Sequence, residues 1–187
     1  MNAFCGVLIK TVIALLLSIT WLLFYKFNNY AFQFFAHSDR AHWIFLPAGL
    51  RVLAVLIFEE VGVLGLIAGA FWTLPYKQTS DLAYNMVLAG TSALAPLFAI
   101  LLFGYLYSIK PNLSGLRGRH IIVMSVIAAL ANTALVNLTL VSFGRFHHDI
   151  TQLLTIFVGD VLGVLILLGI TAQIWNFMSD RLVKKGR

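Results

Sequence analysis

Apolar residues run along this chain in long stretches that are separated by short polar segments. A transmembrane helix needs about 20 predominantly apolar residues. The pattern therefore predicts an all-α, polytopic integral membrane helical bundle with about six transmembrane helices, forming a single transmembrane domain over residues 1–187. The predicted spans are residues 6–25, 43–58, 61–76, 82–107, 120–143 and 151–175.

Two adjacent acidic residues, Glu59 and Glu60, separate the second predicted span from the third. A continuous helix from Trp43 to Trp72 would be about 45 Å long, whereas the hydrocarbon core of a bilayer is about 30 Å thick. Two carboxylates in the middle of that core would also be costly. We therefore expect a tight turn at Glu59 and Glu60, placed at the water interface between two short spans.

The composition supports a membrane protein and excludes other classes. Hydrophobic residues make up 60% of the chain, charged residues make up 11%, and the mean hydropathy is +0.92. A soluble domain has about 25% charged residues, so we expect no separate soluble domain. The net charge of +6 lies in short loops, which indicates membrane orientation rather than nucleic-acid binding. With a single cysteine, Cys5, the chain has no internal disulfide and no cysteine metal cluster.

Basic residues divide unevenly between the two sides of the predicted bundle. With the N-terminus inside, inner segments hold twice as many Lys and Arg residues as outer loops. Cytoplasmic segments carry this excess, so the sequence predicts a multi-pass protein with both termini in the cytoplasm and a short basic tail over residues 176–187. The inner residues are Lys10, Lys110, Arg117, Arg119, Arg181, Lys184, Lys185 and Arg187, and the outer residues are Lys26, Arg40, Lys77 and Arg145.

Two oppositely charged residues lie deep inside predicted spans. From the outer end of its span, Arg51 is about 13 Å deep and Asp160 is about 15 Å deep, at 1.5 Å per residue. Asn132 falls at a similar height. Charged residues at such depths usually face the bundle interior and have a partner. The sequence thus predicts a polar layer of Arg51, Asp160 and Asn132 near the bilayer midplane.

This polar layer has two interpretations. Arg51 and Asp160 can form a buried ion pair that fixes the helix order, since removing one partner of such a pair often costs about 3–5 kcal/mol. They can instead belong to a site for an anion or polar ligand, a proton-responsive switch or a conduction path, because intramembrane ionisable residues are commonly functional. Depth does not fix helix rotation, so the sequence leaves open whether the two residues touch.

The remaining motifs indicate helix packing rather than chemistry. Gly65 and Gly69 form a GxxxG pattern, which favours close helix contact. The sequence has no Ser-His-Asp order, Gly-rich phosphate loop or HExxH motif, so we expect neither enzyme activity nor a cofactor. Residues 147–149 read His-His-Asp, and His37 and His42 lie on the same predicted side. Without a third ligand at a defined spacing, they do not predict a metal site.

Two segments resemble motifs of the integral membrane sensor domain called membrane-associated sensor, type one. The first reads WIFLPAGL over residues 43–50 and is followed, after the acidic turn, by a glycine-bearing helix, and the second reads FVGDVLGVL over residues 157–165. The resemblance covers residues 43–175. It implies a signal-input bundle in the bacterial inner membrane. The residues that match motif positions are Pro47, Gly49, Asp160 and Gly163.

The family typically precedes histidine kinases and cyclic-di-GMP enzymes, whereas only twelve residues follow Trp175 here. We therefore expect a stand-alone sensor-like bundle in the lipid bilayer that detects a signal or small ligand and passes it to a separate signalling protein at the cytoplasmic face. The alternative is a small transporter or channel subunit that uses Arg51 and Asp160. A third interpretation is a membrane scaffold that uses small-residue helix faces such as that of Gly65 and Gly69.

Overall fold

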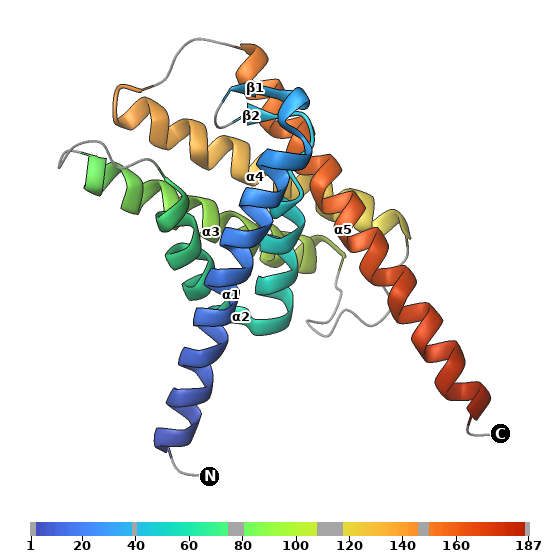
Figure 1. Cartoon of the computed structure of the whole chain (residues 1–187). Coiled ribbons are helices and arrows are strands. Elements are labelled where there is room, and N and C mark those ends of the chain that lie inside the picture. The colour runs from blue at the N-terminus through green and yellow to red at the C-terminus, as the bar shows by residue number, and fades with distance from the viewer. Residues whose placement is uncertain (1–2, 39–40, 75–80, 108–117, 146–149, 186–187) are drawn as a thin grey trace.

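The structure, a computed structural model, is a bundle of long helices (Figure 1). It describes residues 3–38, 41–74, 81–107, 118–145 and 150–185. Between the first two long helices lie a short 3-10 turn and a small antiparallel pair of strands. The elements are α1 (Ala3–Ala31), η1 (Gln33–Phe35), β1 (Ala36–Ser38), β2 (Ala41–His42), α2 (Pro47–Thr73), α3 (Asp81–Tyr107), α4 (Gly118–Ser142) and α5 (Ile150–Lys185).

The outer surface of the bundle is apolar. Large side chains such as Leu23 and Leu64 are 63% and 62% exposed, and many others like them point outward along the helices. An apolar surface of this extent matches lipid rather than water. In the described part of the chain, five helices are long and apolar enough to cross a membrane. These features support a multi-pass membrane protein.

The described part has five long helices rather than six because α2 contains two of the predicted spans. Glu59 has the non-helical angles φ 50° and ψ −122°, and the helix reverses direction there (Figure 1). Gly62 packs against the backbone carbonyl of Ala54, and Arg51 and Thr73 line the same cavity. A straight helix would separate Arg51 from Thr73 by about 33 Å. The expected turn is thus present, and it makes α2 a helical hairpin with two antiparallel legs.

At the turn of this hairpin, glycine substitutions of the neighbouring residues Glu59 and Glu60 are expected to change the free energy of unfolding in opposite directions. A non-glycine residue with the backbone angles of Glu59 is strained by about 1–3 kcal/mol. We expect Glu59→Gly to raise the free energy of unfolding by about 1 kcal/mol because glycine relieves this strain. Glu60→Gly should lower it by about 0.5–1 kcal/mol, since glycine weakens a helix. An SDS titration of each purified variant measures both changes, and equal destabilisation by the two variants would contradict the turn.

The hairpin α2 lies at the centre of the bundle and packs against α1, α3 and α5. Its second leg uses the GxxxG face to contact α1. A Cβ atom added at Gly65 would lie 2.7 Å from the Leu17 Cβ, and one added at Gly69 would lie 2.8 Å from the Trp21 Cβ. The close contact that the GxxxG pattern predicts therefore occurs within the chain. This contact occupies the face that the scaffold interpretation needs for a partner.

The first leg of α2 is anchored at its start by α1 and α5. The backbone N–H of Leu46 donates a hydrogen bond to the buried Asn28 Oδ1 at 2.9 Å, and the N–H of Phe45 donates to the Gly159 carbonyl at 3.1 Å. Asn28 belongs to α1, which continues to Ala31 instead of ending near residue 25 as predicted. The extension beyond residue 25 thus supplies Asn28, which binds the start of α2.

Candidate functional site

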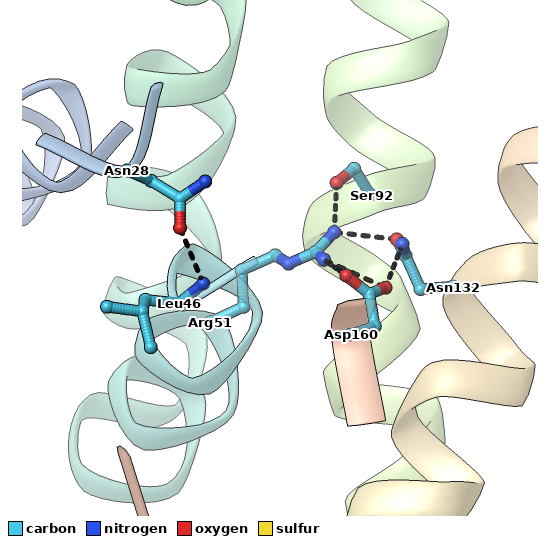
Figure 2. Close-up of polar contacts among 6 residues, drawn as sticks. All are labelled: Asn28, Leu46, Arg51, Ser92, Asn132 and Asp160. Atoms are coloured by element: carbon cyan, nitrogen blue, oxygen red, sulfur yellow. Dashed lines mark hydrogen bonds and ion pairs between the residues drawn. The ribbon is translucent and has the colours of Figure 1, made fainter. Parts of the chain in front are cut away.

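A single guanidinium group organises the polar interior of the bundle (Figure 2). One terminal nitrogen of Arg51 donates hydrogen bonds to Ser92 Oγ and Asn132 Oδ1, both at 2.6 Å. The other terminal nitrogen contacts the two carboxylate oxygens of Asp160 at 3.1 and 3.2 Å. The Asn132 side-chain amide also donates to Asp160 Oδ2 at 2.5 Å. We call Arg51, Ser92, Asn132 and Asp160 the Arg51 cluster.

The Arg51 cluster joins elements from across the bundle. Arg51 comes from the first leg of α2, and its partners Ser92, Asn132 and Asp160 come from α3, α4 and α5. The guanidinium carbon also lies 5.8 Å from the centre of the Trp21 ring, which α1 contributes. Arg51 of α2 therefore contacts a side chain from each of the other long helices in the described part. A change in the contacts of its guanidinium group would alter the packing of all of these helices.

Burial makes the cluster energetically sensitive. Arg51 is 4% exposed and Asp160 is 2% exposed. Charges are costly in a low-dielectric interior unless they are paired and hydrogen-bonded. Asp160 compensates the charge of Arg51, and the amide of Asn132 bridges the two by accepting from one and donating to the other. The cluster is thus electrically neutral as a whole, and loss of either charge leaves the other uncompensated.

A cavity of about 110 Å³ lies beside the cluster. An enclosed polar cavity needs only about 10–15 Å³ to hold a water molecule, so this space is much larger than one water requires. The Arg51 cluster forms one polar side, and most of the other lining side chains are aromatic or aliphatic, with polar groups on Tyr25, His42 and Thr73. The lining residues outside the cluster are Trp21, Tyr25, His42, Phe45, Ala70, Thr73, Leu74, Leu88, Ala89, Val136 and Ile156.

Aromatic rings form one wall of the cavity and hold one another in place. Phe45 packs edge-on against Trp21 and Tyr25, with ring centres 6.5 and 6.3 Å apart, and stacks with His42 at 6.0 Å. The Trp21 ring nitrogen donates to Thr73 Oγ1 at 3.3 Å. Edge-to-face and stacked pairs of this kind are favoured arrangements of aromatic rings. The cavity therefore combines an aromatic wall with a charged and hydrogen-bonding side.

A second, much smaller cavity of about 10 Å³ also borders the Arg51 cluster. Apolar residues from the first leg of α2, from α3, α4 and α5 line it, together with members of the cluster. Because Arg51, Asn132 and Asp160 border both spaces, the ion pair separates them. The other lining residues are Ala48, Val52, Pro96, Ala128, Ala129 and Val164.

The structure brings together the three residues that the sequence predicts for a polar layer. Arg51, Asp160 and Asn132 are in direct contact. Sequence reasoning missed Ser92 and the ring of Trp21. The depth argument could have found Ser92, because it lies about 16 Å along α3 from Asp81. No comparable signal identifies Trp21, since its approach to Arg51 depends on how α1 is rotated.

The motif positions Pro47, Gly49 and Gly163 do not line the larger cavity. Pro47 begins α2, where a missing backbone N–H has no cost. A Cβ atom added at Gly49 would lie 2.6 Å from the Gly163 carbonyl oxygen, and one at Gly163 would meet the Phe45 carbonyl oxygen. These residues hold the first leg of α2 close to α5. They position Arg51 and Asp160 rather than contacting the cavity themselves.

A separate ion pair lies away from the cluster. Arg145 contacts Asp81, which joins the end of α4 to the start of α3. The Arg145 guanidinium also lies 4.2 Å from the centre of the Tyr84 ring. The side chain of Arg145 is 37% exposed, so this pair contributes less to stability than a buried one. The His-His-Asp sequence at residues 147–149 lies outside the described residues.

Comparisons with known proteins do not assign this chain to a family. No protein-family model matches it, and neither a curated protein nor a solved structure matches it. The resemblance to the membrane-associated sensor family therefore stays a prediction. The geometry of the Arg51 cluster and its cavity is the basis on which a function can be proposed.

Proposed function

We propose that this protein is an intramembrane sensor that binds a small ligand in the larger cavity and passes the signal to a separate protein. The observation that carries the proposal is the position of Arg51. Its guanidinium borders the cavity and contacts residues of α1, α3, α4 and α5. A ligand that changes the hydrogen bonds of Arg51 would change the packing of these helices together.

In this proposal, the partner protein binds the cytoplasmic end of the bundle and responds to changes in how the helices pack there. The start of α1 and the end of α5 lie at the end of the bundle toward which the turn of α2 points (Figure 1). The C-terminal segment over residues 176–187 is basic, as is the segment at residues 108–119, and cytoplasmic segments carry such an excess. A bacterial inner-membrane protein with both termini inside would offer this end to a cytoplasmic signalling enzyme.

Transport of a small solute is the second candidate function. The observation in its favour is that the cluster separates two cavities, as a gate in a conduction path would. The small size of the second cavity, about 10 Å³, favours sensing because it does not continue the larger one as a path. Solute flux in liposomes distinguishes the candidates, since a transporter produces flux and a sensor does not.

A cavity-filling substitution tests the sensing proposal. Ala70 lines the larger cavity, and Ala70→Leu would fill part of it without altering the Arg51 cluster. The protein is purified with its surrounding lipid, and the regulatory enzyme that co-purifies is identified by mass spectrometry and assayed. We expect Ala70→Leu to change the activity of that enzyme by at least about fivefold, which is the lower end of typical allosteric coupling.

Ala68→Leu is the matched control, because Ala68 lies on the same leg of α2 and is exposed on the lipid-facing surface. It should leave the activity of the co-purified enzyme at the wild-type level. Equal activities for wild type, Ala70→Leu and Ala68→Leu would overturn the sensing proposal. Flux of a solute through liposomes that carry the wild-type protein alone would replace it with transport.

A further inference from the structure

We propose that the larger cavity binds a neutral molecule with a small apolar body and one hydrogen-bond-accepting oxygen, such as a carbonyl. This inference rests on the proposed function and specifies the chemistry of its ligand. It follows from the size of the cavity, from the hydrogen-bonding groups that the Arg51 cluster leaves unused, and from the charge balance of the site. The same chemistry is found in free small carbonyl compounds and in the head of a tailed, lipid-soluble carbonyl compound.

The size of the cavity limits the buried part of the ligand. A buried apolar cavity of roughly 150 Å³ holds one benzene molecule. The cavity here is about 110 Å³, so we infer by proportion that it encloses about four or five non-hydrogen atoms of the ligand. The aromatic wall of Trp21, Tyr25 and Phe45 favours a flat apolar body. Any longer part of the ligand must extend out of the cavity.

Among the polar groups of the Arg51 cluster, those that make no hydrogen bond within the described residues are donors. Both carboxylate oxygens of Asp160 and the amide oxygen of Asn132 already accept hydrogen bonds. Ser92 Oγ accepts from Arg51, and its own proton has no acceptor among the described residues. The Nε–H of Arg51 likewise donates to no group in the described part of the chain. Since Arg51 and Ser92 line the cavity, a ligand there is recognised through an acceptor.

The charge of the site favours a neutral ligand over an anion. Asp160 already balances Arg51 within the buried cluster. A carboxylate ligand would bring a second negative charge into a site that has a single cation, and a buried charge without a partner is strongly unfavourable. A cation would be repelled by the adjacent Arg51 guanidinium, which together with Asn132 already binds the oxygens of Asp160. A neutral acceptor can use the spare donors without disturbing this balance.

Matched probes of similar size test the inference on the full-length protein in lipid nanodiscs. Cyclopentanone carries the carbonyl, methylenecyclopentane replaces the carbonyl oxygen by a CH₂ group, and isobutyrate carries a charge. Dissociation constants are measured by saturation-transfer difference NMR, with empty nanodiscs to correct for partition into lipid. We expect cyclopentanone to bind about tenfold more tightly than methylenecyclopentane, because one hydrogen bond is at stake. Isobutyrate should bind more weakly than cyclopentanone.

Two variants locate the binding. Ala70→Leu should weaken cyclopentanone binding at least about tenfold by filling the cavity, whereas the lipid-facing Ala68→Leu should leave it unchanged. Ser92→Ala adds no bulk and removes one donor, so it should weaken the binding of cyclopentanone but not that of methylenecyclopentane. A tailed analogue, 2-pentylcyclopentanone, distinguishes the two sources. Tighter binding than cyclopentanone supports a lipid-soluble ligand, and exclusion by the tail supports a free small molecule.

Equal affinity for cyclopentanone and methylenecyclopentane in the wild type would overturn the inference, as would unchanged binding in both Ala70→Leu and Ser92→Ala. This failure is distinguishable from failure of the sensing proposal. If Ala70→Leu still alters the co-purified enzyme while the probes show no carbonyl preference, the cavity is the sensing site and the ligand class is wrong. If the probes bind as expected and the enzyme does not respond, the ligand class stands and sensing fails.

Discussion

Replacing Arg51 by methionine is expected to lower the free energy of unfolding by about 3–5 kcal/mol, because the buried carboxylate of Asp160 loses its counterion. Asp160 is 2% exposed, and only the Asn132 amide would still donate a hydrogen bond to it. Ser92 and Asn132 would lose their contacts to Arg51 as well. The measurement is an SDS titration of the purified protein in mixed micelles.

Lys10→Met is the matched control for this substitution. Lys10 is also a basic residue within a long helix, but its side chain is exposed. Surface substitutions of this kind usually change stability by less than about 0.5 kcal/mol. If Arg51→Met and Lys10→Met had the same small effect, Arg51 would not be a central contact of the bundle. The geometry of the Arg51 cluster would then be wrong.

The second large effect is expected from Gly163→Val, which should lower the free energy of unfolding by about 3 kcal/mol. A Cβ atom at this position overlaps the Phe45 carbonyl group and lies 3.1 Å from the Leu46 backbone nitrogen. These are backbone atoms, so they cannot turn away as a flexible side chain can. The start of α2 must then move from α5, which also separates Arg51 from Asp160.

Gly169→Val on the same helix is the control for Gly163→Val. A Cβ atom added at Gly169 has no neighbour within 4 Å. Valine is also a better helix former than glycine by a few tenths of a kcal/mol. Gly169→Val should therefore leave the SDS titration unchanged or shift it slightly toward stability. A similar loss of stability in both variants would show that close packing at Gly163 is not the cause.

Apolar patterning and depth predicted much of this architecture. The length of the apolar stretches indicated membrane-spanning helices, and the two carboxylates at Glu59 and Glu60 indicated the turn within α2. Counting residues from the span ends placed Arg51 and Asp160 at one height, and the two side chains are in contact. These predictions succeeded because they depend on local sequence and on the constant rise of a helix.

Features that depend on how helices rotate and cross could not be predicted in this way. The spans on either side of Glu59 form one central hairpin, and the sequence alone does not show that α1, α3 and α5 pack around it. The helix α1 extends beyond the predicted span of residues 6–25, and Asn28 in this extension binds the N–H of Leu46. The cavity depends on where Trp21 and Ala70 face, which no residue spacing reveals.

The most direct test of the account is the response of the double variant Arg51→Met, Asp160→Leu. Replacing a buried ion pair by apolar residues of similar volume is often neutral for stability or stabilising, but here it also leaves the buried Asn132 amide without its two partners. The double variant should therefore be less destabilised than Arg51→Met alone. We predict that it is folded and inserted but no longer controls the co-purified enzyme, because the ligand-binding donors of Arg51 are gone. A double variant that is stable and still controls the enzyme normally would contradict the account, and the Arg51–Asp160 pair would then be a structural support for the helices.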